Sequence, residues 1–175
     1  MENPLDKKNI MGFTLVELAV SMLIIGLIST IVLTNYNAGR KQEALNRSVQ
    51  RLAVAIRQAQ NYALFSRVGT KCSTPAGGYG IYVSSASQYV IFGDCSGNRL
   101  YDLASDDSIS TIKVESDVQI SSASLISMTF EPPIGKFYYN GLVPTVSNTI
   151  ILQNSSDVTK QKITNISANG SVSVQ

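Results

Sequence analysis

The most apolar part of the chain is the stretch of residues 13–33, which is rich in Leu, Ile and Val and has Ser21, Gly26, Ser29 and Thr30 as small interruptions. Glu17 is the only ionisable side chain in this stretch. A helix rises by about 1.5 Å per residue, so these residues span roughly 30 Å, the thickness of the hydrocarbon core of a bilayer. The pattern therefore predicts a membrane-spanning helix over residues 13–35.

From Arg40 onward the apolar residues recur every three or four positions, with basic side chains between them. The recurring apolar residues are Leu45, Val49, Leu52, Ile56, Ala59 and Ala63. This spacing places them on one face of a helix. We expect an amphipathic second half of the helix over residues 36–68, ending before Gly69. Its basic side chains are expected in solvent, or against a neighbouring subunit or an anionic partner.

After Gly69 the helical spacing disappears, and short β-rich runs alternate with turn signals. The expected strands cover residues 78–83, 88–94, 109–115, 118–120, 125–130, 136–139, 149–153, 161–166 and 171–174. Asn169-Gly170 is a strong hairpin signal and predicts pairing of the last two strands. The predicted fold class is α+β, a long N-terminal helix packed on an antiparallel β head over residues 69–175.

Composition narrows the chemistry that this head can carry. The chain has no histidine, which is the commonest general base and metal ligand near neutral pH. Its net charge of +2 is too small to argue for nucleic-acid binding. No spaced acid–base set and no phosphate-binding motif is evident, so we expect no catalytic site, no cofactor and no metal.

The two cysteines, Cys72 and Cys95, flank the first two expected strands. A hairpin would bring them together, and cross-linking a loop of this length is worth roughly 3 kcal/mol in the loop-entropy model. We expect a disulfide formed in an oxidising compartment. A metal site is the alternative, although two thiols without histidine make a poor zinc set.

Four aspartates are the remaining candidates for binding a cation, namely Asp94, Asp102, Asp106 and Asp107. Their spacing matches no calcium-loop signature. We therefore expect a solvated acidic loop.

Glu17 is the unusual residue of the N-terminal segment. A carboxylate within a membrane segment costs about 2.5–3.5 kcal/mol. The nearest basic residues, Lys7 and Lys8, lie upstream in a short leader, residues 1–12, and place the N-terminus in the cytoplasm by the positive-inside rule. Glu17 is either a tolerated interfacial charge, or it has a cationic partner from another chain or from an amino terminus made by cleavage before Phe13.

The run from Gly12 to Leu18, Gly-Phe-Thr-Leu-Val-Glu-Leu, resembles the processing and assembly signal of type IV pilins and of the pseudopilins of type II secretion. The resemblance implies that a prepilin peptidase cleaves between Gly12 and Phe13 and N-methylates Phe13. It also implies that Glu17 pairs with the amino group of a neighbouring subunit's first residue. Such an ion pair sets register more than it adds stability.

The order of segments in the head resembles the H-type minor pseudopilins and the FimT/FimU minor pilins. The segments that carry this likeness are the Cys72 region and residues 78–82, 89–94, 130–135 and 163–174.

The resemblance predicts a structural subunit that enters a helical fibre through its N-terminal helix. The precursor is expected in the bacterial inner membrane, beside an assembly platform and other pilin or pseudopilin subunits. The mature chain is expected in an extracytoplasmic fibre. One alternative is a DNA-binding minor pilin of an uptake pilus, although residues 167–175 contain no basic side chain. Another is a membrane-anchored extracytoplasmic binding domain, which a deep polar pocket would favour.

Overall fold

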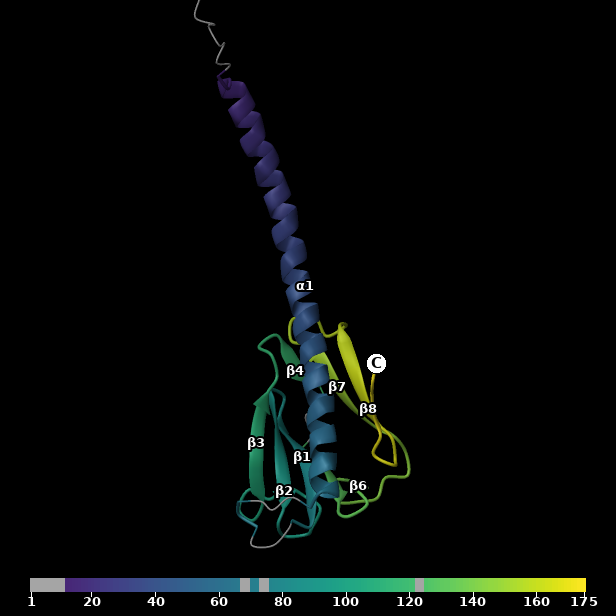
Figure 1. Ribbon diagram of the computed structural model, residues 1–175. Coiled ribbons are helices and arrows are strands. Elements are labelled where there is room, and N and C mark those ends of the chain that lie inside the picture. The colour runs from purple at the N-terminus through teal and green to yellow at the C-terminus, as the bar shows by residue number, and fades with distance from the viewer. Residues whose placement is uncertain (1–11, 67–69, 73–75, 122–124) are drawn as a thin grey trace, which may run out of the picture. The chain divides into compact units, whose positions relative to one another are not determined.

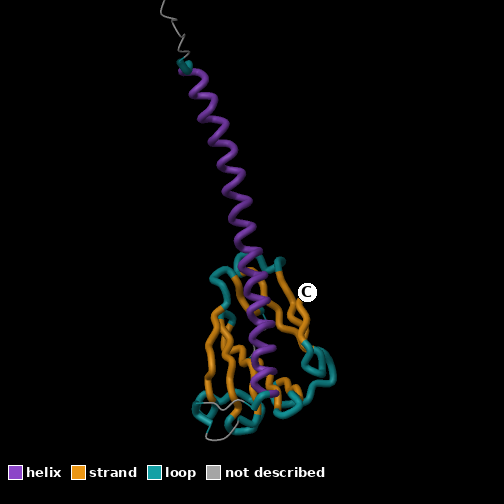
Figure 2. The backbone as a smooth tube through the Cα atoms, viewed as in Figure 1, coloured by secondary structure: helices purple, strands orange, loops and turns teal. Residues whose placement is uncertain are grey.

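The computed structural model describes residues 12–66, 70–72, 76–121 and 125–175. Residues 1–11 of the predicted leader, and the predicted helix stop at Gly69, lie outside the described residues. The chain divides into two compact units, Met1–Gly39 and Arg40–Gln175. Within the described residues it forms one helix, α1 (Leu15–Leu64), followed by β-strands (Figure 1, Figure 2).

The strands form two antiparallel sheets. The first sheet has the order β3-β2-β1-β5-β6 and the second has the order β4-β7-β8-β9. The strands are β1 (Gly78–Ser85), β2 (Gln88–Asp94), β3 (Asp107–Lys113), β4 (Val118–Ile120), β5 (Ile126–Glu131), β6 (Lys136–Tyr139), β7 (Asn148–Asn154), β8 (Gln161–Ile166) and β9 (Val172–Val174). The α+β prediction is confirmed, and so is the pairing of the last two strands around Asn169-Gly170, where Gly170 has a φ of 85°.

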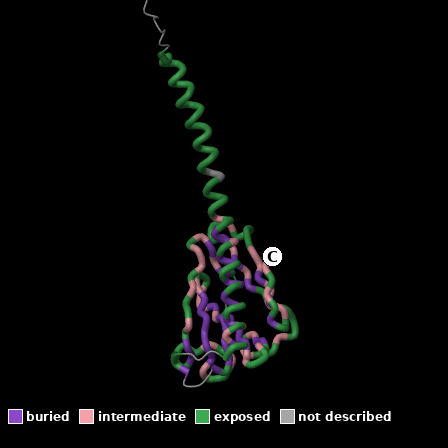
Figure 3. Tube along the Cα trace, viewed as in Figure 1, coloured by how far each residue is buried: buried purple, intermediate pink, exposed green. Residues whose placement is uncertain are grey.

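The core lies between the Arg40–Leu64 part of α1 and the inner faces of both sheets. Each residue of the predicted apolar face is at most 1% exposed: Leu45, Val49, Leu52, Ile56, Ala59 and Ala63. Opposite them lie alternate residues of the strands, such as Ile81 of β1, Met128 of β5 and Leu152 of β7. Burying each large apolar side chain contributes about 1.5–3 kcal/mol, so the amphipathic spacing is what fixes this half of the helix on the sheets. Figure 3 shows this buried layer in purple.

Residues 95–106, the outer loop, fold over the other face of the five-stranded sheet. The Thr129 hydroxyl of β5 donates a hydrogen bond of 2.9 Å to the Arg99 carbonyl. The Arg99 guanidinium lies 4.3 Å from the centre of the Tyr138 ring of β6. The Tyr101 ring lies edge-on to the ring of Phe92, which is fully buried. The outer face of this sheet is therefore partly covered by the chain itself.

Candidate processing and assembly segment

Gly12 and Phe13 precede α1, and both are exposed. A Cβ built at Gly12 would meet no heavy atom within 4 Å among the described residues, its chain neighbours aside. Nothing in the described part of the chain therefore requires glycine at this position. A requirement for glycine would have to come from a molecule that handles the bond between Gly12 and Phe13.

Glu17 lies in the first turn of α1. Its backbone amide donates a hydrogen bond of 3.2 Å to the Thr14 hydroxyl, so Thr14 caps the helix. A carboxylate in a first turn is favoured by the helix dipole. Among the described residues, no hydrogen bond or ion pair is formed by the Glu17 carboxylate, which leaves it available to another molecule. The cap was missed from the sequence, although Thr-x-x-Glu is its usual signature.

The segment that follows Glu17 is apolar and exposed. Leu23 is 63% exposed and Ile31 is 64% exposed. The hydroxyls of Ser21 and Thr30 donate to the backbone carbonyls of Glu17 and Gly26, at 2.7 Å and 3.0 Å. These bonds satisfy both hydroxyls within the helix, which suits an apolar surrounding. By length and composition, α1 is the one helix in the described chain that is able to cross a membrane.

Comparison with known proteins adds one match, and that match lies in this segment. Residues 8–33 match the family model described as the prokaryotic N-terminal methylation motif. The matched range contains Gly12, Phe13 and Glu17. The chain carries a prepilin-type methylation motif. No match was found among curated proteins, and none among solved structures.

The prepilin-type motif indicates a type IV pilin-like precursor, a class of structural rather than enzymatic proteins. It implies processing by prepilin peptidase and assembly with pilin subunits. The exposed apolar helix fits a membrane-anchored precursor of this kind. The match ends at residue 33, so the β-strand head lies outside the matched residues.

Cys72 and Cys95 form a disulfide, as expected from the sequence, with their Cα atoms 5.2 Å apart. The bond ties the segment before β1 to the residue that follows β2. Close to it, the Thr70 amide and hydroxyl donate to the Asp107 carboxylate at 2.6 Å and 2.8 Å. Thr70 and Cys72 are therefore held next to the start of β3 and the end of β2, the first by hydrogen bonds to a carboxylate and the second by a covalent bond.

The expectation of a solvated acidic loop is wrong for three of the four aspartates. Asp94 and Asp106 are fully buried, and Asp107 is 4% exposed. Asp94 accepts hydrogen bonds from the amides of Gly97 and Arg99, both at 2.7 Å. Asp106 accepts from the amides of Cys95 and Asp102, at 3.0 Å and 2.8 Å. The carboxylates of Asp94 and Asp106 therefore accept hydrogen bonds from backbone amides of the outer loop and hold that loop in its conformation.

Burial changes the acid–base behaviour of Asp106. Desolvation raises the pKa of Asp106, and the nearby Asp94 adds to this, while the backbone amides that donate to Asp106 act in the opposite direction.

Arg99 has a φ of 66°, an uncommon conformation for a residue with a side chain. Its amide and its carbonyl are both hydrogen-bonded, and these bonds hold the conformation.

Among the described residues, no group of three or more His, Cys, Asp or Glu side chains is arranged to hold a metal ion.

Proposed function

We propose that this chain is a structural subunit, a pilin or minor pseudopilin, of a type IV pilus or a type II secretion pseudopilus. Prepilin peptidase removes residues 1–12 by cleavage between Gly12 and Phe13, and Phe13 is N-methylated. Residues 13–35 span the inner membrane in the precursor and form the fibre core after assembly. Residues 36–68 form the amphipathic half of the helix, and residues 69–175 form the extracytoplasmic head.

The observation that carries this proposal is the methylation motif over residues 8–33, set at the start of an exposed apolar helix. The Glu17 carboxylate has no partner among the residues that the structure describes, which supports an assembly role, because cleavage creates a cationic amino group that it is able to pair with. The finer assignment to the H-type minor pseudopilins and related minor pilins rests on the resemblance of the head segments, and is part of the same proposal.

Processing is tested by replacing the residue before the cleaved bond. In cells that contain the peptidase, Gly12→Val is expected to leave the full-length precursor in the membrane, as measured by intact mass. Gly39→Val is the control, because a Cβ at that glycine also meets nothing within 4 Å. Cleavage of Gly12→Val at the wild-type rate would contradict the proposal.

Assembly is tested with Glu17→Gln, which keeps the size of the side chain and removes its charge. We expect normal cleavage but loss of incorporation into purified fibres, because leaving a buried cation without its partner costs about 3–5 kcal/mol. Glu43→Gln, on an exposed part of α1, is expected to assemble normally. Normal fibres containing Glu17→Gln would show that the carboxylate has no role in assembly.

A further inference from the structure

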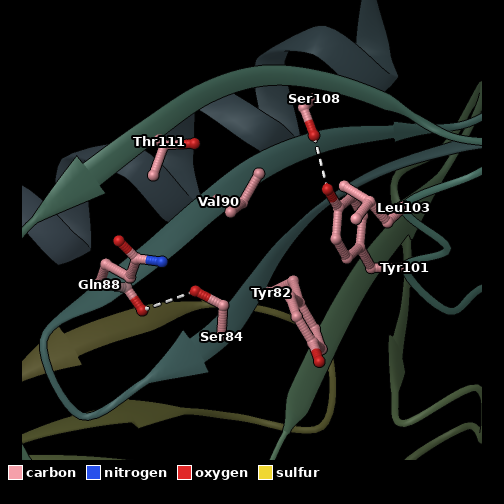
Figure 4. A pocket seen from close by; sticks show the side chains of 8 residues that line it. All are labelled: Tyr82, Ser84, Gln88, Val90, Tyr101, Leu103, Ser108 and Thr111. Atoms are coloured by element: carbon pink, nitrogen blue, oxygen red, sulfur yellow. Dashed lines mark hydrogen bonds between the residues drawn. The ribbon is translucent and has the colours of Figure 1, made fainter.

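A groove of about 430 Å³ lies on the outer face of the five-stranded sheet, over β1, β2 and β3 (Figure 4). Two tyrosine rings and four hydroxyl or amide side chains carry its chemistry. They are Tyr82, Tyr101, Ser84, Gln88, Ser108 and Thr111, and the aliphatic side chains of Val90 and Leu103 complete the lining. We propose that this groove binds a neutral oligosaccharide. The proposal concerns the head alone and is independent of processing and assembly.

Tyr101 is held in place from three sides. Its ring centre lies 4.8 Å from that of Tyr82, with the two planes inclined by 33°. Its ring also lies 5.2 Å from that of the buried Phe92. Its hydroxyl is 2.6 Å from the Ser108 hydroxyl (Figure 4). Tyr101 and Tyr82 therefore form a fixed aromatic surface at the groove.

The outer loop explains why this surface is rigid before any ligand arrives. Tyr101 stands between Arg99 and Asp102, whose amides are bound by the buried carboxylates of Asp94 and Asp106. The disulfide at Cys95 fixes the start of the same loop. Ordering the loop therefore costs little free energy when a ligand binds here, and this pre-organisation favours affinity.

The lining matches a neutral sugar better than a charged ligand. None of the described residues that line the groove carries a charge. A charged ligand would therefore lose hydration without gaining an opposite charge. The C–H face of a pyranose ring packs on an aromatic ring, and its hydroxyls exchange hydrogen bonds with hydroxyl and amide side chains. The groove offers both kinds of partner side by side.

A peptide that adds as a β-strand does not fit this place. Tyr82 pairs with Val90 of β2 and with Ser127 of β5, and Val90 pairs in turn with Thr111 of β3. The backbones of β1 and β2 are therefore paired on both sides, and β3 lies at the edge of the sheet. Strand addition takes place in the plane of the sheet at such an edge, and not on the face that the groove occupies. The ligand has to be recognised by side chains.

The test uses the full chain in micelles of a zwitterionic detergent, because detergents with sugar head groups would compete. Saturation-transfer NMR titrations follow chitotetraose, cellotetraose and maltotetraose, with tetragalacturonate as the charged comparison. We expect saturable binding of at least one neutral tetrasaccharide, weakened about tenfold or more by Tyr101→Ala. Tyr82→Phe keeps the ring and is expected to change affinity by less than about threefold.

Thr111→Arg tests the same groove without disturbing a buried residue, because Thr111 is exposed on β3. It is expected to abolish binding, whereas Thr149→Arg, exposed on β7 of the other sheet, is expected to leave it unchanged. If Tyr101→Ala fails to fold, the binding measured with Thr111→Arg shows whether the groove is the binding site. The proposal is overturned if no neutral tetrasaccharide binds saturably, if tetragalacturonate binds more tightly, or if Thr111→Arg binds like the wild type.

Discussion

At the scale of single residues, Gly80 shows how closely the outer face of the sheet is packed. A Cβ on Gly80 would lie 2.2 Å from the Met128 carbonyl oxygen and 2.7 Å from the Phe92 ring. Both distances are too short for carbon, and the first neighbour is backbone that has no freedom to turn away. Glycine at this position therefore allows the Phe92 ring to approach the backbone of β1 closely.

Gly80→Ala is therefore expected to lower the free energy of unfolding by about 1–3 kcal/mol, as overpacking of a core does. Urea denaturation followed by the near-ultraviolet circular dichroism of the tyrosines measures the change. Gly93→Ala is the matched control on β2, because its Cβ would lie 3.4 Å from the Tyr79 ring, an ordinary contact. Equal effects of the two substitutions would argue against the close approach at Gly80.

Glu131 links two strands to the outer loop through its carboxylate. The Tyr138 hydroxyl donates to it at 2.6 Å, and the Arg99 guanidinium approaches to 3.3 Å. The hydrogen bond from Tyr138, followed by the contributions of Arg99 and Lys136, lowers the pKa of Glu131. A lowered pKa in the folded state means that this stabilisation is present above the unfolded pKa and is lost as the pH falls through the folded one.

Glu131→Gln is accordingly expected to reduce the free energy of unfolding at neutral pH by about 0.5–1 kcal/mol, a small value because the pair is partly exposed. The difference from the wild type should shrink as the pH falls from about 6 to about 2, since the wild-type carboxyl is then protonated. Urea titrations across that range measure it. A difference that grows toward acid pH would contradict the assigned sign.

At the scale of elements, α1 shows why its second half is held on the sheets. Leu52 is fully buried, whereas Val54, two positions along the same helix, is 58% exposed. We expect Leu52→Ala to cost about 2–5 kcal/mol of unfolding free energy, and Val54→Ala to change it by less than about 0.5 kcal/mol. Comparing the urea midpoints of the two variants checks this. Similar losses would mean that the helix packs through a different face.

The periodicity of the sequence was sufficient to locate this helix face and the strands, because both depend on local spacing. The strand expected from residue 109 begins at Asp107, because Asp107 pairs with Gly93 across the sheet. The apolar alternation does not reveal that pairing. The order of strands in the two sheets was not predicted, because it depends on contacts between segments far apart in the chain.

The largest error of the predictions from sequence was the expected exposure of the aspartates at the outer loop. A carboxylate in a sequence looks the same whether water or the backbone surrounds it. Asp94 and Asp106 bind amides of residues 95–102, and only the folded loop brings those amides to them. The positions of Gly12, Phe13 and Glu17 were recognisable because their motif is contiguous. Their roles in processing and assembly stay predictions.

At the scale of the whole molecule, the division at Gly39 separates two kinds of surface. The described side chains between Phe13 and Leu33 are all exposed, although most are apolar. The Arg40–Gln175 unit contains the buried core. The first unit therefore needs lipid, detergent or other subunits around it, whereas the second has its own interior.

Removal of residues 1–39 is expected to move the protein from the membrane pellet to the supernatant after ultracentrifugation, because it removes the exposed apolar helix. The disulfide between Cys72 and Cys95 should persist in the truncated chain, as measured by intact mass under non-reducing conditions. A truncated chain that still sediments with membranes would indicate a second attachment surface in the head.

The alternation along β1 separates two sets of positions that natural selection is able to treat independently. Ile81 and Val83 face the helix, while Tyr82 and Ser84 face away from it. Homologues of this head would be free to diversify the outward set and keep the inward set constant, acquiring new surface preferences on an unchanged scaffold. An insertion of one residue would exchange the two sets, so we expect length variation to be confined to the turns.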